Sequence, residues 1–270
     1  MSKIKTEFKL IENIAQLNIA PNSIIGIGDD AAVVPLSYFL NLKAKHLLFC
    51  NDTFVENIHF STKWSTPFEI GWKAASATIS DIAAMGGIGT FALSSITLGS
   101  YDINWHAELQ NGIKVILERY GISLIGGDVV SGDQLSISIT LIGNTSIEPL
   151  LRSGAQVGDD IWVSGVIGRA HIGLQSLLKN IQIVSVEIKD CIERHKTPIP
   201  RIVLGRALLE EKIASSMIDC SDGLLSECNH LARNSSVSFE LDLESIPVPL
   251  LSEYTIDELI TGGEDFELLL

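Results

Sequence analysis

The chain has 270 residues, which is enough for one large domain or two smaller ones. It carries 33 Asp and Glu against 19 Lys and Arg, a formal net charge of −14. This charge excludes a general nucleic-acid-binding protein, because phosphate backbones select basic surfaces. No apolar run approaches the roughly 18 residues of a membrane-spanning helix. The four cysteines lack CxxC and zinc-site spacing, which favours reduced thiols in a cytoplasmic protein.

Strand-like and helical patterns alternate along the chain, which predicts a mixed fold of the α/β (α+β) class. The predicted strands are His46–Asn51, Thr90–Leu98, Ile122–Ile125, Gln134–Gly143, Asp160–Ser164, Met217–Cys220, Val237–Leu241 and Asp265–Leu270. The predicted helices are Thr66–Met85, Asn104–Tyr120, Arg169–Lys179, Pro200–Lys212 and Gly223–Arg233. The first begins with the capping-box pattern of Thr66 and Glu69 around Pro67. The polar segment 143–159 predicts a junction between domains 1–148 and 149–270.

Several carboxylates stand in glycine-rich or apolar surroundings. Each one alone is compatible with an ordinary turn or helix cap. Together, six acidic sites at strand ends and turns favour Mg²⁺, a hard cation that takes carboxylate oxygens and commonly arrives with substrate phosphates. Asp81 is the clearest case, because it falls near the C-terminus of a predicted helix and has no cation among its helical neighbours. Two or three bound Mg²⁺ ions would also reconcile the acidic chain with a polyphosphate ligand.

Candidate phosphate contacts are fewer. The helix predicted after Ser221-Asp222-Gly223 offers backbone N–H groups at its start, and Arg152 suits bidentate phosphate binding. His59 follows Asp52 by seven residues and, taken alone, is more typical of a structural histidine. Residues 87–92 match G-x-G-x-x-A, but they follow a helix and lead into a strand, the reverse of a dinucleotide site.

Five motifs in order resemble those of the thiamine-monophosphate kinase family. They are GIGDDAAVV, SDIAAMGG, GGDVVSG, IDCSDGLLSE and GGEDFELL, with LLRSGA between the third and fourth. The family belongs to a superfamily with aminoimidazole-ribonucleotide synthetase and the selenophosphate synthetases. The resemblance implies direct in-line transfer of the γ-phosphoryl group of ATP, as co-substrate, to thiamine monophosphate, the last step of thiamine diphosphate biosynthesis. No covalent nucleophile and no phosphoenzyme are expected.

The resemblance also implies an architecture and a set of site residues. Domain 1–148 would bind ATP and Mg²⁺ and pair its sheet with a second copy in a homodimer. Domain 149–270 would be an α+β domain without its final segment, since family members continue beyond GGEDFELL. The implied Mg²⁺ ligands are Asp30, Asn51, Asp52, Asp81, Asp128, Asp219 and Asp222. The implied ATP contacts are Gly127, Asp128, Arg152 and Ser221, and the implied thiamine monophosphate contacts are His59 and Glu264.

One departure from the family pattern concerns the second motif. The family usually has Ser or Thr before the aspartate, whereas Cys50 and Asn51 precede Asp52 here. Asn51 can still offer a carbonyl oxygen to a metal ion. Two alternatives stay open at this point: a related synthetase that activates an amide oxygen with ATP, and a non-catalytic nucleotide-binding paralogue. Neither nucleic acid nor a membrane is an expected partner.

Overall fold

The computed structural model describes residues 9–13, 21, 24–27, 31–180, 185–251 and 253–270. The chain forms two compact units, one of residues 1–79 and 88–148 and the other of residues 80–87 and 149–270. The first unit therefore ends at Glu148. The short segment Ser80–Gly87 groups with the second unit, although the sequence analysis assigned all of 1–148 to one domain.

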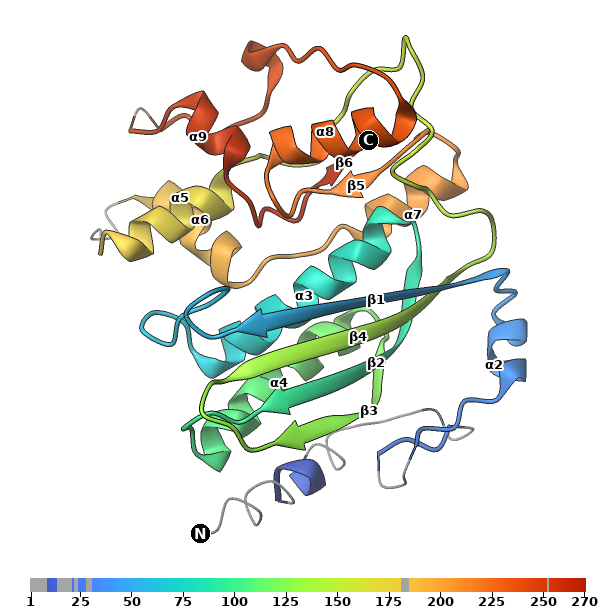
Figure 1. The fold of residues 1–270 in the computed structure, drawn as a ribbon, viewed down its shortest axis with the longest axis vertical. Coiled ribbons are helices and arrows are strands. Elements are labelled where there is room, and N and C mark those ends of the chain that lie inside the picture. Colours follow the sequence, from blue (N-terminus) through green and yellow to red (C-terminus); the bar gives the residue numbers. More distant parts are fainter. Residues whose placement is uncertain (1–8, 14–20, 22–23, 28–30, 181–184, 252) are drawn as a thin grey trace. The chain divides into compact units, whose positions relative to one another are not determined.

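A four-stranded mixed sheet forms the centre of the first unit. Its order is β1 (His46–Val55), β4 (Ser136–Thr145), β2 (Ile88–Thr97) and β3 (Ser123–Val130). β4 is antiparallel to both of its neighbours, and β2 and β3 are parallel. Helices α3 (Pro67–Ala84) and α4 (Ile103–Arg119) lie along one face of the sheet, and the short α2 (Leu36–Asn41) precedes β1 (Figure 1). The predicted mixed α/β fold is confirmed.

The two faces of this sheet differ in character, because side chains alternate along each strand. On the helix-covered face, β4 contributes Ile137, Ile139 and Leu141, which are fully buried. The register places a row of polar residues across all four strands on the opposite face. From β1 to β3 this row is Thr53, Ser138, Ser95 and Asp128. We call this side the open face.

The second unit is mainly helical. It contains α5 (Arg169–Leu178), α6 (Val186–Lys196), α7 (Ile202–Glu210), α8 (Leu224–Ser235), the 3₁₀ turn Leu243–Ser245 and α9 (Ile256–Thr261). The antiparallel pair β5 (Ile218–Asp219) and β6 (Leu268–Leu269) packs against α8 in a core that includes Cys220, Leu231 and Ile260. The sequence analysis missed α6 and α9, although Thr255 and Glu258 form a capping box at the start of α9.

Two predicted strands of the second unit do not form ladders. Residues 160–164 run antiparallel to the last residues, with one bridge between Val163 and Leu269 and reciprocal backbone bonds of 2.9 Å between Trp162 and Leu270. Residues 237–241 pair with no described strand. The predicted strand Asp265–Leu270 is shortened to β6, because Phe266 has a left-handed backbone with φ of 50°. Glu264, just before the predicted strand, is also left-handed, with φ of 71°. Among the helices described, none combines the length and apolar character that crossing a bilayer requires.

Candidate functional site

Asn51 and Asp52 are adjacent on β1, so their side chains lie on opposite faces of the sheet. On the open face, Asn51 Nδ2 donates to Ser138 Oγ at 3.1 Å and to Thr140 Oγ1 at 2.8 Å. Asp52 is on the helix-covered face. Burial raises the pKa of Asp52, while a hydrogen bond with the Thr78 side chain and the nearby His59 act in the opposite direction. The structure therefore does not bring the side chains of Asn51 and Asp52 together.

His59 lies in the turn that follows β1. The backbone N–H of Val55 donates to His59 Nδ1 at 3.1 Å, and the ring meets Phe54 edge-on with centroids 5.5 Å apart. Because a backbone N–H can only donate, Nδ1 is the acceptor and the proton of the neutral ring is on Nε2. The buried Lys73 donates through Nζ to the His59 carbonyl at 3.4 Å. His59 therefore presents an exposed N–H donor that suits an anionic group.

Gly127 and Asp128 lie on β3. A Cβ at Gly127 would sit 1.9 Å from the Ser94 carbonyl oxygen, and its φ of 154° disfavours side chains, so only glycine fits there. The Asp128 carboxylate is exposed on the open face and accepts from the Val129 N–H at 2.9 Å. β1 and β3 form opposite edges of the sheet, so Asp52 and Asp128 are about 14 Å apart by strand spacing. One chain does not place these two carboxylates at one ion.

Two motif segments lie side by side in the second unit. The N–H of Glu264 donates to the Ser221 carbonyl at 2.8 Å, and the N–H of Phe266 donates to the Cys220 carbonyl at 2.9 Å. The Cys220 N–H donates in return to the Glu267 carbonyl at 2.7 Å. These bonds bring Ser221 and Asp222, which precede α8, next to Glu264. Asp219 is buried at the end of β5 in the same segment.

Glu227 is a candidate residue that the sequence analysis missed. It lies in the first turn of α8, is 2% exposed, and accepts the Asp222 N–H at 3.0 Å. Burial raises the pKa of Glu227, and the bond from Asp222 and the charge of Arg152 act against this rise. Arg152 is therefore within electrostatic range of the first turn of α8. The sequence signal for Glu227 is its place one helical turn after Ser221-Asp222-Gly223.

Two predicted metal ligands lie outside the segments described above. Asp30 lies outside the described residues, and Asp81 is half-buried near the end of α3. Within the described ranges, no three His, Cys, Asp or Glu side chains gather closely enough to hold a metal ion. The predicted donors are all oxygen atoms, which fits Mg²⁺ and not a zinc site. Mg²⁺ normally keeps waters and takes substrate phosphates, so it does not require an all-protein cage.

Asp265 stabilises the turn beside the site from within the core. It is 1% exposed, and its carboxylate accepts the N–H groups of Gly168 at 2.6 Å and Ala170 at 2.8 Å, at the start of α5. Gly168 itself provides no side-chain cap. Burial raises the pKa of Asp265 to about 6, and the two N–H bonds only partly offset this effect. Asp265 thus caps α5 from a distant part of the sequence.

The raised pKa of Asp265 predicts a pH dependence of stability. The folded state holds the proton of Asp265 more tightly than the unfolded chain does. The contribution of this proton to the free energy of unfolding is therefore complete below the unfolded pKa, and it is lost as pH rises through about 6. We expect the wild type to gain about 2 kcal/mol relative to Asp265→Asn between pH 7 and pH 4. Urea unfolding of both proteins across this range measures the gain. A difference that stays constant with pH would contradict this assignment.

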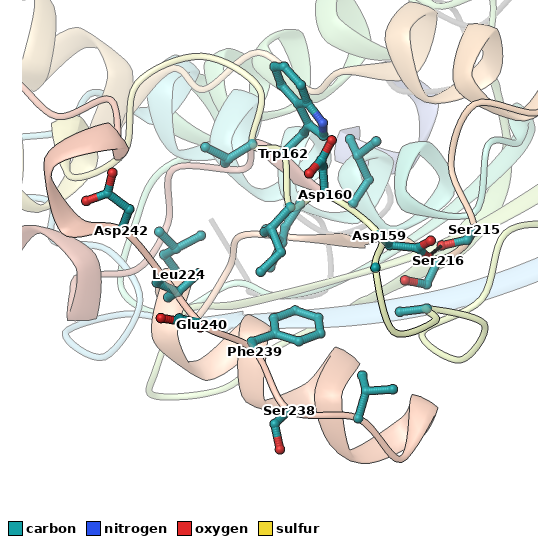
Figure 2. A pocket seen from close by; sticks show the side chains of 18 of the residues that line it. Asp159, Asp160, Trp162, Ser215, Ser216, Leu224, Ser238, Phe239, Glu240 and Asp242 are labelled. Carbon is teal, nitrogen blue, oxygen red and sulfur yellow. Dashed lines mark hydrogen bonds between the residues drawn. The ribbon is translucent and has the colours of Figure 1, made fainter.

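A separate groove of about 820 Å³ lies in the second unit. Figure 2 shows Trp162, Phe239 and Leu224 along it, with the carboxylates of Asp159 and Asp242 at its rim. None of the site residues predicted from the sequence lines this groove. The groove is therefore not part of the site formed by the two motif segments.

Comparisons with known proteins agree with the motifs. A family model described as AIR synthase related protein, N-terminal domain, matches residues 28–145. A thiamine-monophosphate kinase of Bacillus subtilis (strain 168) is 40% identical, over 97% of this chain and 82% of the relative. The solved thiamine-monophosphate kinase of Stenotrophomonas maltophilia K279a aligns with a TM-score of 0.84 at 32% identity, over 97% of this chain and 84% of that one. A structure described as AaThiL complexed with AMPPCP and TMP aligns with a TM-score of 0.78 at 31% identity, over 100% and 86%.

Proposed function

The chain belongs to the thiamine-monophosphate kinase family, and on this premise we propose that it phosphorylates thiamine monophosphate with ATP to give thiamine diphosphate and ADP. The observation that carries this proposal is the pairing of the IDCSDG and GGEDF segments, which brings Ser221, Asp222 and Glu264 together in one unit. A relative of the same fold is described in complex with an ATP analogue and TMP, which supports both substrates.

The proposed chemistry requires charge neutralisation and alignment, because donor and acceptor are both phosphates. Arg152 and the N–H groups at the start of α8 suit the ATP phosphates. The Nε2–H of His59 suits the phosphate of the acceptor. A phosphate oxygen is itself the nucleophile, so no side chain has to form a covalent intermediate.

Mg²⁺ is the metal that the donor set fits best. Several Mg²⁺ ions would be held by Asp52, Asp128, Asp219 and Asp222, together with Asp81 and Asp30 from the motifs. When bound, Mg²⁺ lowers the repulsion between the two anionic substrates. Burial raises the pKa of Asp52, so a nearby cation would favour the ionised form of this carboxylate.

We also propose that the active form is a homodimer. Asp52 and Asp128 lie on opposite edges and opposite faces of one sheet, so a second copy would be needed to bring such a pair to one ion. β1 is a ten-residue edge strand that exposes Phe49 to 68% and Leu47 to 41% on the open face. A long edge strand with exposed apolar side chains is typical of a surface that pairs with another chain.

The test is an assay of the purified chain with Mg-ATP and thiamine monophosphate, with products separated by chromatography. We expect thiamine diphosphate and ADP in equal amounts, and no product when thiamine replaces the monophosphate. A cyclised product from an amide substrate would instead indicate a synthetase. Binding of Mg-ATP without ADP release would indicate a non-catalytic paralogue and would refute the proposal.

A further inference from the structure

The carboxylate of Glu264 lies against a buried histidine. His195 Nδ1 is 3.3 Å from Glu264 Oε2, and the side chains are 5% and 28% exposed, respectively. This is a close polar contact between a fixed ring and a partly exposed acid. The histidine therefore limits the positions that the Glu264 carboxylate can take.

His195 is held firmly by its own helix. It lies in the last turn of α6, which packs closely on α5. At Gly173 of α5, a Cβ would lie 2.2 Å from the Cys191 carbonyl oxygen and 3.0 Å from the Cβ of His195. The neighbouring Arg194 donates through Nη2 to the carbonyl of Asp265 at 3.0 Å. Two consecutive residues of α6 thus contact the turn that carries Glu264.

The turn itself is anchored on its buried side. Asp265 accepts two N–H groups at the start of α5, and Glu267 is bound by Arg201, whose Nε lies 2.6 Å from Glu267 Oε2. Asp265 and Glu267 are 1% and 2% exposed, so Glu264 is the accessible carboxylate of the three. Its left-handed backbone, with φ of 71°, is a conformation that surrounding contacts must maintain.

We propose that His195 is a positioning residue for thiamine monophosphate binding, because it orients the Glu264 carboxylate toward the substrate. This inference rests on the proposed function. The substrate carries a permanent positive charge on its thiazolium ring, and a carboxylate in a fixed place attracts a cation at lower entropic cost than a mobile one. His195 contacts Glu264 and not the reacting phosphates, so its effect is on acceptor binding.

The test compares two replacements of His195. His195→Gln places its amide near the Nε2 position and loses the contact with Glu264, whereas His195→Asn places an amide near the Nδ1 position and retains a donor. We expect His195→Gln to raise the KM for thiamine monophosphate about tenfold, with the KM for ATP and the Tm nearly unchanged. His195→Asn is expected to recover most of the wild-type KM.

A matched control is His46→Asn, which loses the Nε2 position and so breaks another His–Glu contact, between His46 Nε2 and Glu148 Oε1 at 3.2 Å in the first unit. It should leave both KM values unchanged. Equal KM values for wild type and His195→Gln would overturn the inference, as would a parallel loss of ATP affinity and Tm, which indicates a purely structural role.

Calorimetric titration with thiamine monophosphate, in the presence of Mg²⁺ and a non-hydrolysable ATP analogue, separates the two proposals. If the wild type binds the substrate but makes no product, the proposed function fails, while the ratio of affinities between wild type and His195→Gln still tests His195. A tenfold ratio would support the inference, and equal affinities would overturn it. If the wild type does not bind thiamine monophosphate, both proposals fail.

Discussion

Replacement of Asp128 by Asn is expected to lower kcat by about 10³-fold, because it removes a negative charge from a site where charge neutralisation is the main catalytic task. The amide has nearly the same shape and keeps one oxygen donor, so the loss reflects the charge. The fold should survive, since the Asp128 side chain is exposed on the open face, where it accepts the N–H of its neighbour Val129. Steady-state rates at increasing Mg²⁺ concentrations measure the effect.

Asp133→Asn is the matched control. Asp133 is an exposed aspartate in the connection between β3 and β4, only five positions from Asp128, and it should retain the wild-type rate within about twofold. Circular dichroism should give the same Tm for both variants. A wild-type rate in Asp128→Asn would refute its role as a metal ligand.

The same variant tests the homodimer. Asp52→Asn and Asp128→Asn, each inactive alone, can be co-expressed with different tags. Random pairing of the two variants makes half of the dimers mixed. If the two carboxylates of one site come from different copies, each mixed dimer has one intact site and one doubly substituted site. The mixture should then recover about one quarter of the wild-type rate, as expected for a symmetric dimer. No recovery would place both residues of each site in the same chain.

Much of the fold could be predicted from local patterns. The capping box before α3 is present as expected, with the Thr66 N–H 2.7 Å from Glu69 Oε2 and the Glu69 N–H 3.3 Å from Thr66 Oγ1. β4 follows its period-two pattern, with alternate side chains buried. The strand predicted at Val237–Leu241 is wrong, because its apolar side chains pack against the core of the second unit without a ladder partner. Local pattern shows burial, but pairing depends on what lies beside the segment.

The candidate site was less predictable, because its contacts join distant parts of the chain. The motifs identified Ser221 and Glu264, but no local pattern shows that their segments share hydrogen bonds. His195 falls in a helix whose polar sequence gave no signal, and α7, β5, α8, the 3₁₀ turn and α9 separate it from Glu264 along the chain. Asn51 and Asp52 show the reverse: their opposite orientations follow from strand alternation alone once β1 is assigned.

Replacement of Glu267 by Gln is expected to have the largest effect on stability. Glu267 is 2% exposed and accepts from Arg194 at 2.6 Å, from Arg201 Nε at 2.6 Å and from Ser164 at 2.6 Å. Burial lowers the pKa of Arg194 and Glu267 counteracts this, so the carboxylate compensates a charge that is costly to bury. Removing one partner of a buried ion pair costs about 3–5 kcal/mol, and Glu267→Gln should lower the free energy of unfolding by this amount.

Glu210→Gln is the control for this prediction. Glu210 accepts from Arg206 Nε at 2.7 Å on α7, with both side chains about half exposed, so its loss should cost less than about 1 kcal/mol. Urea unfolding gives both values, and hydrogen exchange of residues 262–270 shows where the change occurs. We expect faster exchange in this segment for Glu267→Gln alone, because its carboxylate joins the turn to α6 and to the start of α7. Equal unfolding free energies for the two variants would mean that Arg194 and Arg201 are compensated by other groups, and the turn that carries Glu264 would then be held mainly by Asp265.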